Sequence, residues 1–159
     1  MKRLFLLSVT LLISLTSMAK EIKTEIVIHS SPEKIWKILT DFENYPNWNP
    51  FITYINGNVE KGNKIVVNIN PPNGSKMVFK PTILTIIENK ELVWQGKVLF
   101  KGLFDGTHKF ELIDNGNGTT TFIQSEKFSG IFVGLFNPQK TQNGFNEMNH
   151  KLKALIENQ

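Results

Sequence analysis

The sequence contains no cysteine at all, and this absence excludes several kinds of chemistry. A chain without thiols forms no disulfide, offers no thiolate ligand to zinc and has no cysteine nucleophile. Histidine is scarce as well: His29, His108 and His150 are far apart in the chain and do not have the spacing of metal ligands. No cofactor motif is present either, so we expect neither a metal nor a cofactor.

Basic clusters, repeats and low-complexity segments are also missing. The net charge is +4, but the lysines are scattered, whereas a nucleic-acid-binding surface needs a basic stripe. No repeat recurs at a solenoid period. A chain of 159 residues with 40% hydrophobic and 20% charged residues is typical of one globular domain with a hydrophobic core. We therefore expect no nucleic-acid partner, and the oligomeric state stays open.

The N-terminus has the pattern of a secretory signal peptide. Lys2 and Arg3 precede an apolar run over residues 4–15, and Ser17-Met18-Ala19 supplies small residues at a cleavage site. The run is too short to span a bilayer comfortably, and the missing cysteine excludes a lipoprotein anchor. We predict a signal peptide over residues 1–19 and export from a bacterial cell to the periplasm or the medium, with no stable membrane anchor after cleavage. An uncleaved membrane anchor is the alternative.

The remaining chain, residues 20–159, is predicted to begin with a strand followed by a helix and to end with a second helix. Residues 22–29 alternate like a strand, and Ser31-Pro32 opens a helix that Tyr45-Pro46 ends. Residues 138–159 carry the single apolar stripe of an amphipathic helix.

Six more strands are predicted between the two helices, because turn residues separate apolar runs at hairpin spacing. These runs are residues 52–59, 64–70, 76–87, 91–100, 104–114 and 119–128. Pro81 interrupts the third run and predicts an edge, a bend or a bulge there. The order of one strand, one helix, six strands and one helix predicts an α+β fold with the last helix packed across the sheet. Residues 130–136 form an apolar link that serves as a lid, touches a membrane or is buried, and we expect burial.

Several motifs together resemble the START-like or SRPBCC superfamily, and within it the polyketide cyclase/dehydrase-like branch. They are IVIHSSPEKIWKILTDFENYPNWNPFI, LVWQG, GTHKFEL, TTTFIQSEKFSG and GFNEMNHKLKALIE, which span nearly all of residues 20–159. The resemblance implies a helix-grip fold, in which a curved seven-stranded antiparallel sheet wraps a long C-terminal helix around a deep apolar cavity. In such a fold the aromatic segment 42–52 closes one end of the cavity. The superfamily includes lipid carriers, hormone-binding proteins and aromatase/cyclases, so the resemblance implies a pocket and leaves the function open.

Two glycine-containing turns predict the register of three strands. A three-residue loop over 116–118, with Gly118 in the left-handed conformation, places His108 opposite Glu126. A three-residue loop over 101–103 places Gly96 opposite His108. Both registers gather the large apolar side chains on one face of the sheet and the charged ones on the other.

His108, Gln124 and Glu126 are polar exceptions on the predicted apolar face. A buried carboxylate is costly without a partner, and a histidine on the facing strand supplies one. Three roles stay open for His108 and Glu126: a pair that satisfies its own hydrogen bonds, a pair that orients a ligand, and an acid/base pair acting on a carbonyl compound. Neither an oxyanion site nor a cofactor motif accompanies the pair, so we expect a binding protein rather than an enzyme.

We predict an exported protein that holds a small hydrophobic ligand, such as a lipid, a polyketide or an aromatic compound, in a central cavity. The predicted ligand-binding residues are Phe79, Trp94, His108, Phe110, Phe122, Gln124, Glu126, Phe128, Phe145, Asn149 and, at the mouth, Trp48. One alternative is a polyketide cyclase/dehydratase-like enzyme with His108 and Glu126 as the acid/base pair. Another is a protein-interaction module that docks through segment 42–52, which would leave Tyr45 and Trp48 exposed over a filled interior.

Overall fold

The computed structural model describes residues 18–98 and 101–158. Residues 1–17 of the predicted signal peptide lie outside this range. In chain order the elements are β1 (Met18–Ile28), α1 (Pro32–Thr40), η1 (Phe42–Asn44), α2 (Tyr45–Trp48), β2 (Ile52–Asn56), β3 (Val66–Ile69), β4 (Met77–Phe79), β5 (Thr82–Ile87), β6 (Glu91–Val98), β7 (Phe104–Asp114), β8 (Thr120–Gly130), η2 (Val133–Leu135) and α3 (Gln139–Glu157). Across the described residues, no helix combines the length and apolar character needed to cross a membrane.

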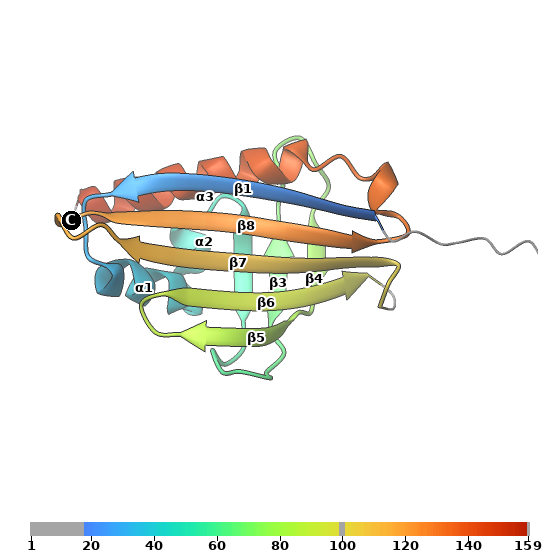
Figure 1. Ribbon diagram of the computed structural model, residues 1–159, viewed down its shortest axis with the longest axis horizontal. Helices are drawn as coiled ribbons and strands as arrows, with labels where there is room; N and C mark the ends of the chain where they lie inside the picture. The colour runs from blue at the N-terminus through green and yellow to red at the C-terminus, as the bar shows by residue number, and fades with distance from the viewer. Residues whose placement is uncertain (1–17, 99–100, 159) are drawn as a thin grey trace, which may run out of the picture.

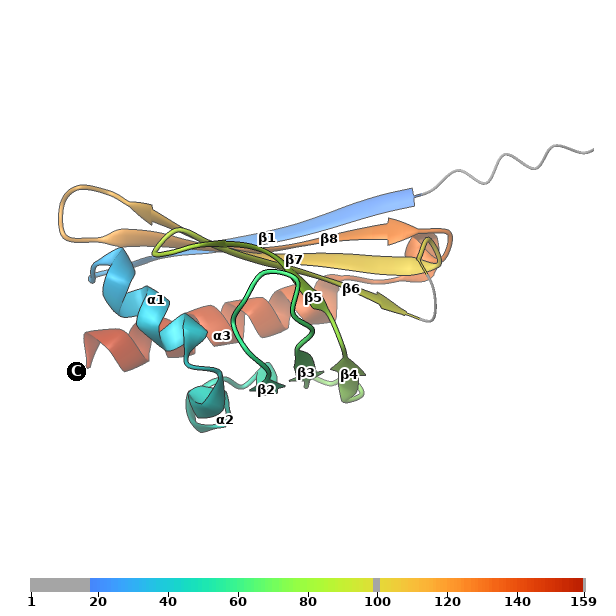
Figure 2. The same cartoon turned by 90° about the horizontal axis from the view of Figure 1, so that it is seen from below.

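The predicted α+β fold with a curved antiparallel sheet and a C-terminal helix is confirmed (Figure 1). The strands belong to a five-stranded sheet in the order β1-β8-β7-β6-β5 and a three-stranded sheet in the order β2-β3-β4. Seen from below, α3 runs beneath the larger sheet and β2–β4 lie on the same side of it (Figure 2). The helix is therefore held between the two sheets on one face of the larger one.

The predicted seven strands of one sheet appear as eight strands in two sheets within the described residues. Pro81 is the physical reason, because it lacks a backbone N–H and divides the predicted run 76–87 into β4 and β5. The two sheets still join at this point. The Ile65 N–H donates to the Pro81 carbonyl at 2.9 Å, and the Ile83 N–H donates to the Asn63 carbonyl at 2.9 Å.

The first helix ends at Thr40, before the predicted stop at Tyr45-Pro46. That dipeptide opens the short helix α2 instead, because proline is tolerated in the first turn of a helix. Tyr45 is fully buried, and its hydroxyl donates to the Leu39 carbonyl at 2.7 Å. Burial, together with the nearby Asp41 carboxylate, raises the pKa of Tyr45 well above its ordinary value. The aromatic segment 42–52 therefore folds inward.

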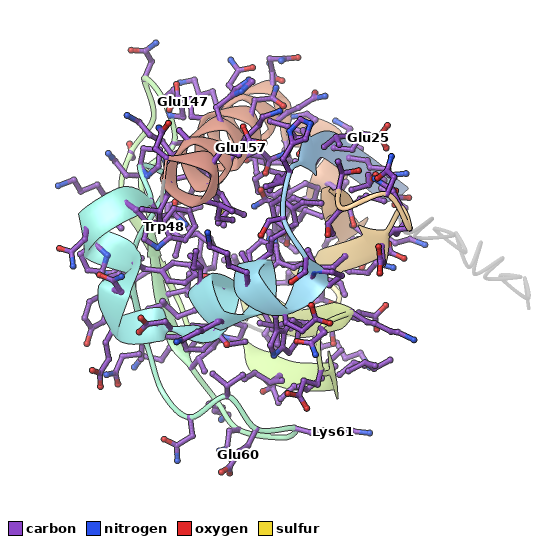
Figure 3. The ribbon with its side chains drawn as sticks, turned by 90° about the vertical axis from the view of Figure 1, so that its left-hand side faces the viewer. Glu25, Trp48, Glu60, Lys61, Glu147 and Glu157 are labelled. Carbon is purple, nitrogen blue, oxygen red and sulfur yellow. The ribbon has the colours of Figure 1, made fainter. Side chains whose placement is uncertain are left out.

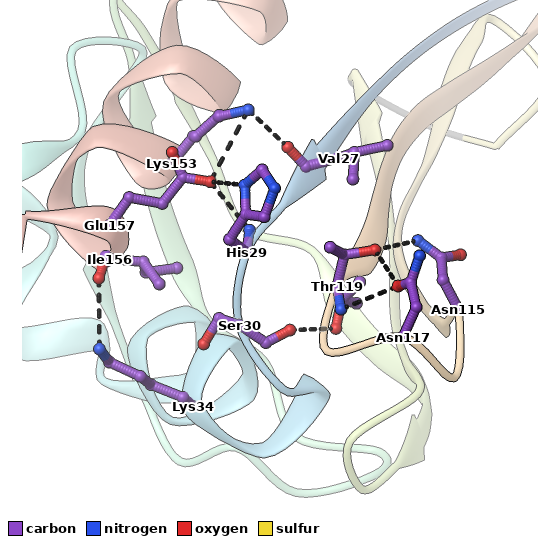
Figure 4. Close-up of polar contacts among 11 residues, drawn as sticks. Val27, His29, Ser30, Lys34, Asn115, Asn117, Thr119, Lys153, Ile156 and Glu157 are labelled. Carbon is purple, nitrogen blue, oxygen red and sulfur yellow. Dashed lines mark hydrogen bonds and ion pairs between the residues drawn. The ribbon is translucent and has the colours of Figure 1, made fainter.

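The C-terminal half of α3 is tied closely to the end of β1 (Figure 4). Its buried stripe, which includes Met148, Leu152 and Ile156, packs against the sheet. At the end of the helix, Glu157 Oε1 accepts hydrogen bonds from the backbone N–H of His29 at 2.8 Å and from its ring at 3.0 Å. This end of the interior is consequently closed by direct packing.

The predicted register of β7 and β8 is confirmed: His108 faces Glu126 and Phe110 faces Gln124. Gly118 has the predicted left-handed conformation, with φ at +81°. The predicted register of β6 and β7 is wrong by two residues, because His108 faces Trp94 rather than Gly96. Val98 pairs with Phe104, so the connection is longer than the predicted loop 101–103. A shift of two residues keeps every side chain on its predicted face.

Candidate ligand-binding cavity

A cavity of about 520 Å³ lies between the two sheets and the N-terminal half of α3. This volume is within the range of roughly 300–1,000 Å³ that small-molecule sites occupy. Its walls are mostly apolar and come from both sheets and from α3. The lining residues are Phe51, Ile52, Val67, Ile69, Met77, Val78, Phe79, Pro81, Trp94, Gly96, Lys97, Val98, Phe104, Gly106, His108, Glu126, Phe128, Phe136, Thr141 and Phe145.

Six of the predicted ligand-binding residues line this cavity and five do not. The lining ones are Phe79, Trp94, His108, Glu126, Phe128 and Phe145. The others are Trp48, Phe110, Phe122, Gln124 and Asn149, none of which borders the cavity. The reason is the position of α3: its C-terminal half packs directly on the sheet and fills the space that the prediction assigned to the ligand. A ligand-binding role for the six lining residues stays a prediction.

Gln124 and Asn149 belong to the packing between α3 and the sheet. Asn149 Nδ2 donates to Thr24 Oγ1 at 3.0 Å, and that hydroxyl donates to the backbone carbonyl of Gln124 at 3.4 Å. Gln124 Nε2 contacts the sulfur of Met148 at 3.5 Å. Both amides are almost fully buried. They position the helix on the sheet and lie away from the cavity.

Trp48 also lies elsewhere than predicted. Its ring packs on Tyr45 with the ring centroids 5.1 Å apart. It borders a shallow surface groove with Lys151 and Leu155. Figure 3 shows Trp48 near the C-terminal end of α3, which Glu157 marks. Trp48 therefore covers the closed end of the fold. The exposed lining residues are Met77 and Val78 of β4 and Lys97 and Val98 at the end of β6, so the cavity opens there.

His108 and Glu126 form a polar pair in the cavity wall. His108 Nδ1 lies 2.7 Å from Glu126 Oε2, so a proton on Nδ1 donates to the carboxylate. His108 is 3% exposed, and its ring stacks on Trp94 with 4.7 Å between centroids, while Phe110 and Phe145 meet it edge-on. Its Nε2 has no protein hydrogen-bond partner. The histidine is thus held rigidly by aromatic packing behind the carboxylate.

Glu126 presents its second oxygen to the cavity above a glycine. A Cβ atom placed on Gly106 would come within 2.5 Å of Glu126 Oε1, so only a glycine leaves room for the carboxylate in this position. The Glu126 side chain is 16% exposed. Among the described residues that line the cavity, Glu126 supplies the only carboxylate. This arrangement can accept a hydrogen bond from a hydroxyl or amine of a bound molecule, or accept and return a proton.

Many cavity residues were not among the predicted ones, and five of them come from the smaller sheet. Val67 and Ile69 of β3 line the cavity, and so do Met77 and Val78 of β4. The alternation along β3 is a sequence signal that Val67 and Ile69 share one face of the strand. Nothing local in the sequence, however, shows that β2–β4 form a separate sheet facing the larger one. No group of three or more acidic or histidine side chains suited to a metal ion occurs within the described residues.

The link over residues 130–136 is only partly buried, which corrects the expectation of burial. Val133 is fully buried, and Phe136 packs on Phe104 with 5.1 Å between ring centroids. Ile131, Phe132 and Leu135 instead project from the surface, and Leu135 is 87% exposed.

Comparisons with solved structures show the same fold at low sequence identity. A START superfamily protein from Mycobacterium smegmatis is 18% identical, with 87% of this chain and 97% of that chain covered and a TM-score of 0.67. Major latex-like protein 151 from Panax ginseng is 14% identical over 87% and 97% of the two chains, with a TM-score of 0.72. Norcoclaurine synthase from Thalictrum flavum, in complex with dopamine and hydroxybenzaldehyde, is 14% identical over 99% and 98%, with a TM-score of 0.71.

A search of curated proteins found no match to this chain. A family model described as polyketide cyclase / dehydrase and lipid transport matches residues 19–157. This match covers almost all of the described residues, including both sheets, the cavity and α3. The chain therefore belongs to the polyketide cyclase/dehydrase and lipid transport family of START-like proteins.

Proposed function

We propose that the protein binds a small hydrophobic ligand in the cavity and directs a hydroxyl or amine of that ligand at Glu126. The observation that carries this proposal is the position of the carboxylate: Glu126 is the only carboxylate among the described residues that line this mostly apolar cavity, and His108 holds it from behind at 2.7 Å. Hydrophobic ligand binding is the common function of the fold family. The polar group of the ligand is the part that this chain's own residues specify.

The energetics favour a ligand with a donor group. Burying apolar surface contributes about 25 cal/mol per Å², so ~300 Å² of ligand surface supplies roughly 7 kcal/mol before the costs of association. A hydrogen bond to a charged acceptor contributes a further 1.5–3 kcal/mol, or about 10- to 100-fold in affinity. A ligand carboxylate at the same position would place two negative charges side by side, which is unfavourable. The site should therefore prefer alcohols and amines to acids.

The first experiment is native mass spectrometry of the protein purified from its own host, followed by solvent extraction. A bound compound of defined mass with a hydroxyl or amine group supports the proposal. A ligand-free mass, together with failure to bind a neutral apolar dye such as Nile red, would contradict hydrophobic ligand binding altogether.

A matched series then tests the role of Glu126. Decanol, decylamine and decanoate have the same chain length and differ only at the polar end, and each competes with Nile red for the cavity. We expect decanol and decylamine to displace the dye at concentrations at least tenfold lower than decanoate does. Glu126→Gln should remove most of this preference, because the negative charge is lost. Glu25→Gln, a change at an exposed carboxylate of β1, is the control and should leave the preference intact.

Acid/base catalysis is a second candidate, and the same pair favours it. Glu126 reaches the cavity and His108 contacts it, as a proton-transferring pair requires. The compound that leaves the protein distinguishes a carrier from an enzyme. A carrier returns its ligand unchanged, whereas an enzyme returns a compound of altered mass or isomeric form, and His108→Ala abolishes that conversion while binding persists. The docking-module alternative has no such support, because Tyr45 is buried and the interior contains a cavity.

We also propose that the protein is exported. The support is the N-terminal pattern of a charged start, an apolar run and small residues before Lys20. Mass measurement of the protein from separated cell fractions tests this. A chain beginning at Lys20 outside the cytoplasm is expected, and a full-length chain in the cytoplasm would contradict export.

A further inference from the structure

We propose that the open end of the cavity docks on an anionic lipid membrane. This inference goes beyond the cavity's ligand and does not depend on it, because it concerns the outer surface around the opening. The surface is called the mouth face here. Its exposed apolar residues are Met77, Val78, Val98, Ile131, Phe132 and Leu135.

The mouth face is continuous with the rim of the cavity. Met77 and Val78 of β4 and Val98 at the end of β6 border the cavity and are also exposed to solvent. The ends of β6 and β8 and the start of β1 lie together at one end of the larger sheet (Figures 1 and 2). Exposed apolar patches of this kind mark surfaces that meet a partner or a membrane.

Backbone hydrogen bonds hold the link over residues 130–136 at this same end of the larger sheet. The Ile131 N–H donates to the Gly102 carbonyl at 3.1 Å, and the Phe132 N–H donates to the Leu103 carbonyl at 3.1 Å. Gly130 makes the approach possible, because it has a φ of +131° and any Cβ there would lie 2.5 Å from the Leu103 carbonyl oxygen. The β6–β7 connection and the link therefore form one surface.

The exposed apolar side chains are supported from below. Val133 is fully buried and Phe136 packs between Phe104 and Phe128. Lys20 Nζ donates to the Phe136 carbonyl at 2.6 Å and to the Gly134 carbonyl at 3.2 Å. Leu135 consequently projects from a turn that is anchored on both sides, which is the geometry needed for insertion into a lipid surface.

The charges around the mouth face are mostly positive. Exposed lysines flank it on either side of β4, on β6, on the β6–β7 connection and at the start of α3; they are Lys76, Lys80, Lys97, Lys101 and Lys140. The carboxylates nearby are largely withdrawn. Asp105 is buried and accepts a hydrogen bond from the Gly102 N–H at 2.9 Å, and Glu126 faces the cavity. Glu21 is exposed, but it lies opposite Lys127 on the neighbouring strand.

This combination fits an anionic membrane better than a protein partner. Aliphatic and aromatic side chains with few directional polar groups insert into the acyl boundary, and the flanking lysines attract acidic headgroups. The cavity would then open onto the lipid surface from which a hydrophobic ligand comes.

Vesicle sedimentation tests the proposal with the protein purified after export. Phosphatidylcholine vesicles with and without phosphatidylglycerol are compared at low and high salt. We expect binding to the mixed vesicles, a loss of binding as salt rises, and at least tenfold weaker binding to pure phosphatidylcholine. No binding of the unmodified protein to the mixed vesicles would overturn the proposal, and equal binding to both vesicle types would overturn the role of the lysines.

Matched variants localise the contact. Phe132→Asp and Leu135→Asp should each lower the partition onto mixed vesicles at least tenfold. Ile87→Asp is the control, because Ile87 and Phe132 are both 49% exposed and Ile87 lies at the opposite end of the sheet. Equal losses in the control and the mouth-face variants would overturn the proposal.

A charge-reversal pair completes the test. Lys80→Glu with Lys101→Glu should weaken binding to the mixed vesicles, whereas Lys61→Glu with Lys90→Glu, two lysines that do not flank the mouth face, should not. Nile red binding without vesicles is measured for every variant. If Phe132→Asp loses vesicle binding and keeps dye binding, docking and cavity function are separate properties. If the unmodified protein binds vesicles but no dye, the proposed cavity function fails while the docking proposal stands.

Discussion

Replacing Tyr45 with phenylalanine removes one buried hydrogen bond with little change in shape. The Tyr45 hydroxyl donates to the Leu39 carbonyl at 2.7 Å. Leu39 lies in the last turn of α1, where backbone carbonyls have no partner within the helix. Tyr45→Phe leaves this buried carbonyl unpaired, and such a loss costs about 1–3 kcal/mol. We expect the free energy of unfolding near neutral pH to fall by that amount.

The same residue predicts how stability changes in alkali. Burial and Asp41 raise the folded-state pKa of Tyr45 above its ordinary value of 10.0. The contribution is therefore complete below the unfolded-state pKa and is lost as the pH rises above it. One proton bound more tightly in the folded state corresponds to roughly 1 kcal/mol of lost stability between about pH 10 and pH 11. Tyr45→Phe lacks this loss, so the stability difference between the two proteins should shrink in that interval.

Urea unfolding followed by tryptophan fluorescence measures both effects, near neutral pH and at about pH 11. Tyr54→Phe is the control, because Tyr54 is 43% exposed and has no comparable burial. Lysine titration affects all three proteins alike and cancels in the differences. A stability difference that stays constant or grows with pH would refute the reasoning, and so would a Tyr45→Phe protein as stable as the parent.

Two further predictions concern glycines at close approaches. Gly106→Ala should displace the Glu126 carboxylate and weaken alcohol binding about tenfold or more. Gly96→Ala is the control, because Gly96 lies on the facing strand of the same cavity and a Cβ there meets only an ordinary contact. Equal alcohol affinities of the two variants in dye competition would contradict this prediction. Gly144→Ala should destabilise the protein by up to about 2 kcal/mol in urea unfolding, because the new Cβ overlaps the buried Phe51 ring and overpacking outweighs the gain in helix propensity; a more stable variant would show that the ring moves freely.

Local signals in the sequence predicted the parts of the fold that depend on neighbouring residues. The turn at Gly116–Gly118 predicted that His108 faces Glu126, because turn type and side-chain alternation together allow one register. The β6–β7 connection was not determined in this way. A three-residue and a longer loop differ by two paired positions, and both keep the same faces inward, so the pattern could not decide whether Trp94 or Gly96 faces His108.

The sequence by itself determined the order of the elements, the inward face of the larger sheet and the pairing of His108 with Glu126. These follow from periodicity, turn chemistry and proline, which act over a few residues. Only the tertiary structure decided where the cavity lies, because that depends on how closely α3 meets the two sheets along its length. The helix packs on the sheet near Met148 and leaves space for the cavity near Phe145. The tertiary structure likewise leaves Leu135 exposed beside the opening of the cavity. Such distances result from many long-range contacts at once, and no local pattern contains them.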